Sequence, residues 1–204
     1  MEFRKSAIGQ GYGHLMERLV TGRLARFGLT PNTATTFGAV VALVVPLAFA
    51  FSPWAGFVVI GCSALVDSVD GQLARLTQSQ SRFGAFWDST LDRISDCLYL
   101  GGFWVYFWSR MDQVFWLSAA FMTAMLLTLL VSYTKARIEG LGGSCGAGLM
   151  DRVVRTVYLL AWALIIALWP SIPGYEIWLG LGLYLLLTLG TVVQRVKAAH
   201  TNLV

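Results

Sequence analysis

The sequence predicts an all-α integral membrane protein with six transmembrane helices, preceded by an N-terminal amphipathic helix in the membrane interface. Three observations lead to this fold class. Of the 204 residues, 56% are hydrophobic and 13% are charged, and the mean hydropathy is +0.65, which is unusual for a soluble domain. Long uncharged stretches recur at lengths that suit membrane-crossing helices. Basic residues gather on one side of the topology that these stretches define.

Residues 1–28 are predicted to form a juxtamembrane helix. Apolar Leu15 and Leu19 lie there among Arg18 and Arg23, a pattern typical of an amphipathic helix on the surface of a membrane leaflet. A basic tail without fixed structure is the alternative. The region also lacks the uninterrupted apolar core of a cleavable signal peptide.

The spans follow from the uncharged runs and the prolines that interrupt them. The run over 27–66 has 40 residues, and it must fold back because roughly 20 residues cross the hydrocarbon core. Pro53 marks the predicted turn, since proline removes a backbone hydrogen bond. Pro170 and Pro173 separate the last two spans. Residues 1–204 are predicted to form one membrane domain with spans near 33–51, 54–76, 84–109, 113–137, 152–170 and 176–196.

The orientation follows from the basic residues, because cytoplasmic loops carry an excess of Lys and Arg. Only Arg110 falls on the opposite side of the six-span topology. Both termini are therefore predicted to be cytoplasmic, in a multi-pass protein of the cytoplasmic membrane. The net charge of +4 does not indicate nucleic-acid binding, because the basic residues flank apolar stretches and form no dense run. The cytoplasmic set comprises Arg4, Lys5, Arg18, Arg23, Arg26, Arg75, Arg82, Lys135, Arg137, Arg152, Arg155, Arg195 and Lys197.

Acidic residues cluster at the cytoplasmic ends of the second and third spans. The chain has 11 acidic residues, and a carboxylate inside a span costs about 2.5–3.5 kcal/mol on insertion scales. Asp67 and Asp70 share one helix face, as do Asp88 and Asp92, because they are three and four positions apart. Carboxylates without His or Cys favour Mg²⁺, Mn²⁺ or Ca²⁺ over zinc. These four residues are the predicted metal ligands, with Asp96 beside them.

Two other interpretations of the acidic cluster remain open at this stage. The carboxylates could belong to a structural charge network with Arg75, Arg82 and Arg93. They could also line the path of a cation or proton transporter. The third span carries no charge between Asp96 and its outer end, which favours an active site that faces the cytoplasm.

The glycines and one arginine near the carboxylates favour a phosphate-bearing ligand. Gly71 follows Asp70, and Gly84 lies one turn before Asp88. Both glycines let a bulky ligand approach the backbone closely. Arg75 lies one turn beyond Gly71, where it is placed to meet a phosphate.

The acidic segment matches a known signature. Asp67-Ser-Val-Asp70-Gly71-Gln-Leu-Ala74-Arg75, followed after eight residues by Gly84-Ala-Phe-Trp-Asp88-Ser-Thr-Leu-Asp92, resembles the signature of the CDP-alcohol phosphotransferases at all eight positions and spacings. The resemblance implies that an alcohol hydroxyl attacks the β-phosphorus of a CDP-linked lipid and expels CMP. It further implies two Mg²⁺ ions, or Mn²⁺, on the carboxylates, with Asp92 as the general base.

The resemblance also implies a binding site for the CDP-lipid. The segment at the start of the first span resembles the family's second nucleotide-contacting stretch, although Pro31 and Asn32 also fit a simple helix start with Thr30 as its cap. Ser81 occupies a loop position where the family often has a small hydroxyl residue. The predicted CDP-lipid contacts are Pro31, Asn32, Thr33, Ala34, Gly71, Ala74, Arg75, Ser81 and Gly84.

Basic residues at the cytoplasmic ends of the last three spans are candidates for binding the phosphate of the acceptor alcohol, although the positive-inside rule alone accounts for cations there. The segments 132–137 and 151–155 resemble those of the prokaryotic phosphatidylinositol phosphate synthases. This implies transfer of a phosphatidyl group from CDP-diacylglycerol to inositol 1-phosphate, with glycerol 3-phosphate as the alternative acceptor. The glycine-rich segment 140–148 departs from the expected pattern. The predicted phosphate ligands are Lys135, Arg152, Arg155 and Arg195.

A homodimer is expected mainly from the same resemblance. Gly101 and Gly102, together with small residues at 118–120, permit close contact between helices of two copies. The same glycines fit packing within one subunit equally well.

Overall fold

The computed structural model describes residues 30–169 and 175–203. The juxtamembrane helix predicted for residues 1–28 lies outside this part of the chain. All the regular elements within the described residues are α-helices, as the sequence predicts. The described side chains exclude those of Asp70, Arg75, Leu76, Tyr175 and Glu176.

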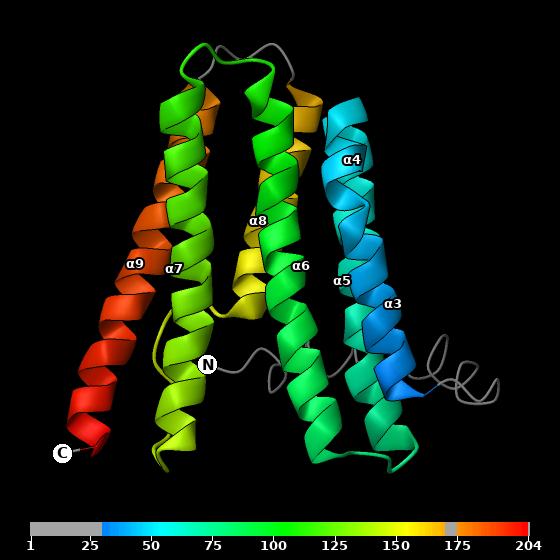
Figure 1. Ribbon diagram of the computed structural model, residues 1–204, viewed down its shortest axis with the longest axis vertical. Helices are drawn as coiled ribbons and strands as arrows, with labels where there is room; N and C mark the ends of the chain where they lie inside the picture. The colour runs from blue at the N-terminus through cyan, green and yellow to red at the C-terminus, as the bar shows by residue number, and fades with distance from the viewer. Residues whose placement is uncertain (1–29, 170–174, 204) are drawn as a thin grey trace.

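The helices lie side by side along the long axis of the molecule (Figure 1). The chain reverses direction between α4 and α5, α5 and α6, α6 and α7, α7 and α8, and α8 and α9. One end of the bundle therefore carries the α5–α6 and α7–α8 connections and the C-terminus. The helices are α3 (Pro31–Leu43), α4 (Val45–Phe51), α5 (Pro53–Leu76), α6 (Arg82–Trp108), α7 (Val114–Gly140), α8 (Arg152–Leu168) and α9 (Tyr175–Leu203).

The first predicted span consists of two consecutive helices, α3 and α4, which meet at Val44. Pro46 explains the break, because a proline has no N–H to donate and its ring crowds the preceding turn. The amide of Val44 bonds instead to the carbonyl of Val41, at 3.1 Å, in a tighter turn. The uncharged run predicts a single uniform span here and does not predict the break.

Among residues 30–169 and 175–203, four segments are long and apolar enough to cross a membrane: Pro31–Phe51, Pro53–Ala74, Val114–Gly140 and Ile177–Leu203. These four segments agree with the predicted class of membrane protein. They account for four of the six predicted spans. The helix α6 carries all its charges between Arg82 and Asp96, and the rest of the helix is uncharged. The helix α8 has 17 residues, which at 1.5 Å per residue extend about 26 Å, somewhat less than a hydrocarbon core of about 30 Å.

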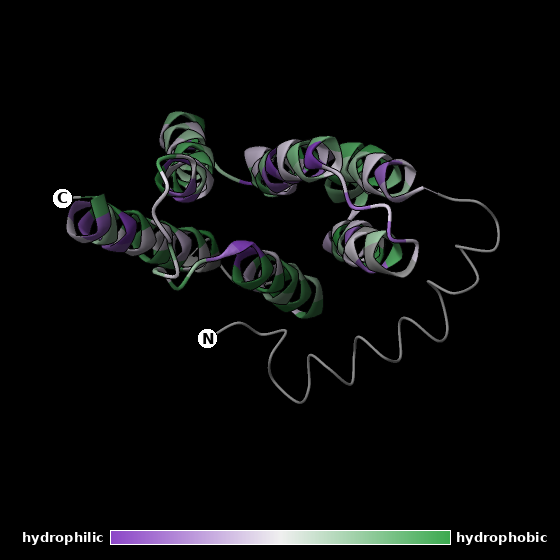
Figure 2. Cartoon of the chain, turned by 90° about the horizontal axis from the view of Figure 1, so that it is seen from below, coloured by the Kyte–Doolittle hydropathy of each residue, from purple (hydrophilic) through white to green (hydrophobic). Residues whose placement is uncertain are grey.

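Large apolar side chains cover the outside of the bundle. Leu47, Phe115 and Leu179 are 60%, 74% and 72% exposed, and hydrophobic residues occupy much of the length of the helices (Figure 2). Such surface is costly in water and suits lipid. Inside the bundle, Trp162 of α8 stacks on Phe103 of α6 with ring centroids 4.4 Å apart.

Hydrogen bonds between helices fix the frame that carries the acidic residues. The hydroxyl of Ser63 on α5 donates to the carbonyl of Gly38 on α3, at 2.9 Å. The hydroxyl of Tyr99 on α6 donates to the same Ser63 oxygen, at 2.8 Å. Asp67 lies one helical turn beyond Ser63, so these bonds fix where its helix lies relative to α3 and α6.

Gly102 serves packing within the chain. A Cβ atom at this position would lie 2.5 Å from Cδ2 of Phe49 and 2.8 Å from Cγ1 of Val45. Phe49 is 1% exposed and also packs against Gly56 of α5. The close approach of α4 to α6 therefore explains this glycine, which is the second of the two interpretations that the sequence allows.

Candidate active site

Three carboxylates converge at the end of the bundle that carries the α5–α6 connection. Asp67 lies on α5, and Asp88 and Asp92 lie one turn apart on α6. One ligand oxygen from each of the three lies within 4.8 Å of the others, and all three side chains are partly buried. The donor set is all oxygen and anionic, which fits Mg²⁺ or Mn²⁺. The side chain of Asp70, the fourth predicted ligand, lies outside the described residues.

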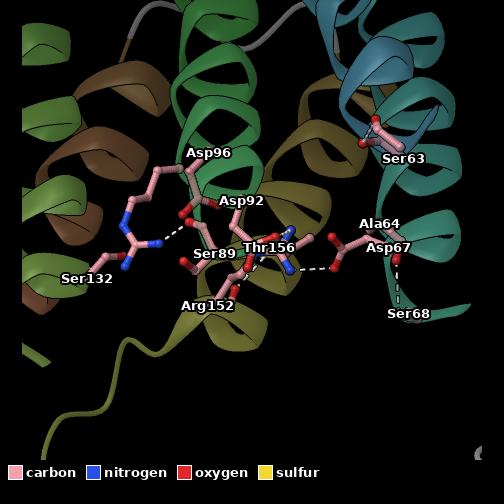
Figure 3. A network of polar contacts seen from close by, with 12 residues as sticks. Ser63, Ala64, Asp67, Ser68, Ser89, Asp92, Asp96, Ser132, Arg152 and Thr156 are labelled. Atoms are coloured by element: carbon pink, nitrogen blue, oxygen red, sulfur yellow. Dashed lines mark hydrogen bonds and ion pairs between the residues drawn. The ribbon is translucent and has the colours of Figure 1, made fainter. Parts of the chain in front are cut away.

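Arg152 of α8 bridges two of these carboxylates (Figure 3). Its Nη1 atom donates to Oδ2 of Asp67, and its Nη2 atom lies 2.9 Å from Oδ1 of Asp92. The side chain of Arg152 is 28% exposed. A cation that the sequence predicts as an acceptor ligand therefore contacts the predicted metal ligands directly.

Arg155, one turn further along α8, lies deeper in the bundle. Its Nη2 atom donates to Oδ2 of Asp96 at 2.6 Å, and the two side chains are 2% and 4% exposed. The same guanidinium donates to the carbonyl of Met150 at 3.0 Å and to the hydroxyl of Ser132 at 3.3 Å. Arg155 thus joins α8 to α6, to α7 and to the segment that precedes α8.

Arg195 ties α9 to the segment that precedes α8. Its Nε atom donates to the carbonyl of Ala147 at 3.0 Å, and its Nη1 atom donates to the carbonyl of Val131 on α7. Gly148 allows this approach, because it has a φ of +111° and a Cβ there would lie 2.5 Å from Cγ2 of Thr191. This contact gives a structural reason for one glycine, Gly148, of the glycine-rich segment that departs from the expected pattern.

A cavity of about 340 Å³ brings the predicted acceptor residues together. Residues from α6, α7, α8 and α9 line it, and Asp92 connects it to the carboxylate cluster. Its wall carries five cationic side chains beside hydroxyl and carboxylate groups. The lining residues are Ser89, Asp92, Arg93, Asp96, Ser132, Lys135, Ala136, Glu139, Asp151, Arg152, Arg155 and Arg195.

Several of these lining residues are absent from the sequence-based prediction. Ser132, Lys135 and Glu139 follow the three- and four-residue spacing of one face of α7, and this periodicity could have identified Ser132 and Glu139. Glu139 lies 3.9 Å from Nζ of Lys135, and both side chains are about half exposed. Asp151 caps α8, since its Oδ1 atom accepts a hydrogen bond from the amide of Val154 at 3.0 Å.

A second cavity, of about 540 Å³, lies between the starts of α3 and α6 and the end of α5. Thr33 is exposed and Ala34 is buried, and neither belongs to its wall, while the side chain of Arg75 lies outside the described residues. The wall contains six of the nine predicted CDP-lipid contacts. These are Pro31, Asn32, Gly71, Ala74, Ser81 and Gly84.

The cavity wall is built by helix starts. Thr30 caps α3, with Oγ1 3.2 Å from the amide of Thr33, as the helix-start interpretation predicts. Ser81 caps α6 by accepting a hydrogen bond from the amide of Gly84, at 2.9 Å. A Cβ at Gly84 would lie 3.1 Å from Oδ1 of Asn32, so glycine keeps the two helix starts close. Asp88 also lines this cavity, which therefore adjoins the carboxylate cluster.

The fold and the site define a class: a helical protein with membrane-crossing segments and an acidic cluster between two polar cavities. Residues 28–192 match the family model for CDP-alcohol phosphatidyltransferases. The chain belongs to this family and is a transferase of phospholipid synthesis, so the predicted reaction class is confirmed and the transporter alternative is set aside.

Similar relatives within the family include phosphatidylinositol phosphate synthases. The chain is 36% identical over 182 residues to a phosphatidylinositol phosphate synthase from Streptomyces avermitilis, covering 85% of this chain and 73% of that protein. The crystal structure of Mycobacterium tuberculosis phosphatidylinositol phosphate synthase with manganese and citrate matches with a TM-score of 0.79 and 29% identity, over 90% of this chain and 88% of that one. The same enzyme with CDP-DAG bound matches with a TM-score of 0.76 and 29% identity, over 90% and 92% of the two chains.

Proposed function

We propose that this protein transfers a phosphatidyl group from CDP-diacylglycerol to inositol 1-phosphate, releasing CMP and forming phosphatidylinositol phosphate. The observation that carries the proposal is the position of the carboxylate cluster between two cavities. Asp88 lines the cavity that contains most of the predicted CDP-lipid contacts, and Asp92 lines the cationic cavity. Donor and acceptor would therefore meet at the carboxylates.

The carboxylates Asp67, Asp70, Asp88 and Asp92 would hold the divalent cations, with two Mg²⁺ ions as the proposed number and Mn²⁺ as a substitute. A bound cation neutralises charge on the pyrophosphate and on the departing CMP. The manganese complex of the mycobacterial relative supports this assignment. Gly71 and Gly84 leave room for the nucleotide beside the backbone.

Asp92 is the proposed general base. Its carboxylate faces the acceptor cavity, where it would take the proton of the attacking hydroxyl as the new bond to the β-phosphorus forms. The bond between that phosphorus and the bridging oxygen breaks, and the electron pair leaves with CMP. The proton stays on the Asp92 carboxyl until solvent removes it.

The cationic wall of the acceptor cavity favours an alcohol that carries a phosphate. Lys135, Arg152, Arg155 and Arg195 bring cationic groups to this wall, where the phosphate of an acceptor would bind. Ser89 and Glu139 in the same wall could meet the ring hydroxyls of inositol. Glycerol 3-phosphate is the second candidate because it carries the same phosphate on a smaller alcohol.

The membrane arrangement belongs to the same proposal. We place six spans across the cytoplasmic membrane, with α6 and α8 crossing beside the four strongly apolar segments. The termini and both cavities face the cytoplasm, because the basic residues gather at that end. A homodimer is proposed as the functional unit.

The proposal is tested by measuring CMP release from CDP-diacylglycerol and Mg²⁺ by the full chain in detergent. The acceptors are inositol 1-phosphate, glycerol 3-phosphate, free inositol and serine, and Asp92→Asn provides the blank. Release with inositol 1-phosphate supports the proposal. Release with glycerol 3-phosphate alone would move the assignment to the second candidate. If none of the acceptors gives CMP release, both candidates are overturned.

A further inference from the structure

Arg152 belongs to two sites at once. It contacts the carboxylates of Asp67 and Asp92, and it lines the acceptor cavity. We propose that Arg152 exchanges partners during the reaction cycle: it neutralises these two carboxylates before a divalent cation binds, and it turns to the acceptor's phosphate once the cation has taken them. This inference rests on the proposed function of the site.

The pairing of Arg152 with the two carboxylates is specific. The guanidinium uses two different nitrogen atoms for carboxylates on two different helices, Asp67 on α5 and Asp92 on α6. The Asp92 side chain is only 15% exposed, so its negative charge is poorly compensated by water and needs a partner. Arg152 therefore supplies the positive charge that holds the carboxylates together while they carry no metal ion.

A divalent cation and the guanidinium compete for the same oxygens. Asp67 and Asp92 are two of the three residues whose oxygens lie within 4.8 Å of one another. A cation coordinated there would use the oxygens that Arg152 contacts, and the two positive centres would repel each other. Cation binding therefore requires Arg152 to give up at least part of this pairing.

The acceptor cavity gives the released guanidinium a place to go. The Nε atom of Arg152 is buried and has no hydrogen-bond partner among the described residues. A small rotation of the side chain keeps it within the wall that also contains Lys135, where a phosphate would accept a bidentate contact.

Arg155 and Arg195 in the same cavity wall are not free to exchange in this way. Arg155 is held by Asp96 and by the carbonyl of Met150. Arg195 is held by the carbonyls of Ala147 and Val131. These partners hold both guanidiniums in place in the cavity wall, whereas the described partners of the Arg152 guanidinium are carboxylates of the cation cluster.

The exchange couples the two sites. A cation that displaces Arg152 strengthens binding of the acceptor phosphate, and by linkage the phosphate strengthens binding of the cation. The enzyme would thus bind the acceptor strongly only after the cation site is loaded.

The test is a Mn²⁺ titration of the full chain in detergent, with free Mn²⁺ followed by electron paramagnetic resonance and no CDP-lipid present. Arg152→Gln should bind Mn²⁺ about tenfold more tightly than the wild type, within the usual range of coupling between sites. Inositol 1-phosphate should tighten Mn²⁺ binding by the wild type and leave Arg152→Gln unchanged. Arg93→Gln removes a charge from the same cavity wall, but Nη1 of Arg93 donates to the carbonyl of Ser89 on its own helix, so this variant should bind Mn²⁺ like the wild type.

Equal or weaker Mn²⁺ binding by Arg152→Gln would overturn the exchange, as would the same increase in Arg93→Gln. If Arg152→Gln does not fold, Arg152→Lys decides, because a lysine cannot bridge two carboxylates as a guanidinium does and should give an intermediate increase. CMP release by the wild type is measured on the same preparation. If the wild type releases no CMP with inositol 1-phosphate, the proposed function is overturned. The Mn²⁺ affinities of the variants still test whether Arg152 and the cation compete for the carboxylates.

Discussion

Arg155 of α8 and Asp96 of α6 form an ion pair that is almost completely buried, with Nη2 of the arginine 2.6 Å from Oδ2 of the aspartate. The pair lies one helical turn beyond the pairing of Arg152 with Asp92. Two successive turns of α8 are therefore attached to two successive turns of α6. The pair of Arg152 and Asp92 includes a predicted metal ligand. In the buried pair, Arg155 also donates to the carbonyl of Met150.

Replacing Asp96 with Asn should destabilise the protein by about 3–5 kcal/mol, because it leaves the Arg155 charge buried and uncompensated. The measurement is thermal unfolding in detergent. Asp112→Asn, at an exposed position between α6 and α7, is the matched control and should unfold like the wild type. The double variant Asp96→Leu with Arg155→Leu should recover part of the loss, since neither charge then remains buried alone. Identical unfolding of Asp96→Asn and Asp112→Asn would contradict this view of the pair.

Gly102→Ala should lower stability by about 1–3 kcal/mol, the usual effect of overpacking a core. The added Cβ would lie 2.5 Å from Cδ2 of Phe49, so α4 or α6 must shift. Gly182→Ala provides the comparison, because nothing lies within 4 Å of a Cβ at that position. Thermal unfolding of both variants in detergent checks the prediction, and an unchanged transition for Gly102→Ala would mean that the two helices pack less closely than described.

Asp88→Asn should lower CMP release by about 100-fold or more, since a cation at the cluster is expected to supply several kcal/mol of charge stabilisation. Its Mn²⁺ binding, followed by electron paramagnetic resonance, should weaken in parallel. Treatment of the wild type with EDTA should abolish release, and added Mg²⁺ or Mn²⁺ should restore it. Full activity of the EDTA-treated protein would contradict the assignment of a metal to the cluster.

Lys135→Ala should raise the KM for inositol 1-phosphate about tenfold, which corresponds to the loss of one hydrogen bond to a charged group. The KM for CDP-diacylglycerol should stay unchanged, because Lys135 lines the acceptor cavity and does not line the cavity that contains the predicted CDP-lipid contacts. Lys197→Ala, on the exposed face of α9 and outside both cavity walls, is the control. An increase in the KM for the lipid donor, or an equal effect in Lys197→Ala, would argue against a role for Lys135 in acceptor binding.

The features that the sequence predicts well depend on local spacing. The three-residue and four-residue intervals in the acidic motif place carboxylates on common helix faces, and Thr30 before Pro31 marks a helix start. Such signals need only the geometry of one helix. The signature adds the relation between two helices, since Asp67 and Asp88 belong to different elements and still converge.

The features that the sequence does not reveal depend on contacts between distant residues. Arg152 lies 85 positions from Asp67, and Arg155 lies 59 positions from Asp96. Charge alone cannot tell which arginine neutralises a carboxylate and which one faces a ligand. The break at Val44 is missed for a different reason, because a proline inside an apolar run can kink a helix without ending the span.

The central claim is that the cationic cavity selects inositol 1-phosphate over other phosphate-bearing alcohols. The most direct measurement is a competition, with inositol 1-phosphate and glycerol 3-phosphate at equal concentration in one reaction with CDP-diacylglycerol and Mg²⁺, followed by mass spectrometry of the lipid products. The product ratio gives the ratio of kcat/KM values for the two acceptors. Phosphatidylinositol phosphate is the predicted main product. A predominance of phosphatidylglycerophosphate would contradict the assignment of the acceptor.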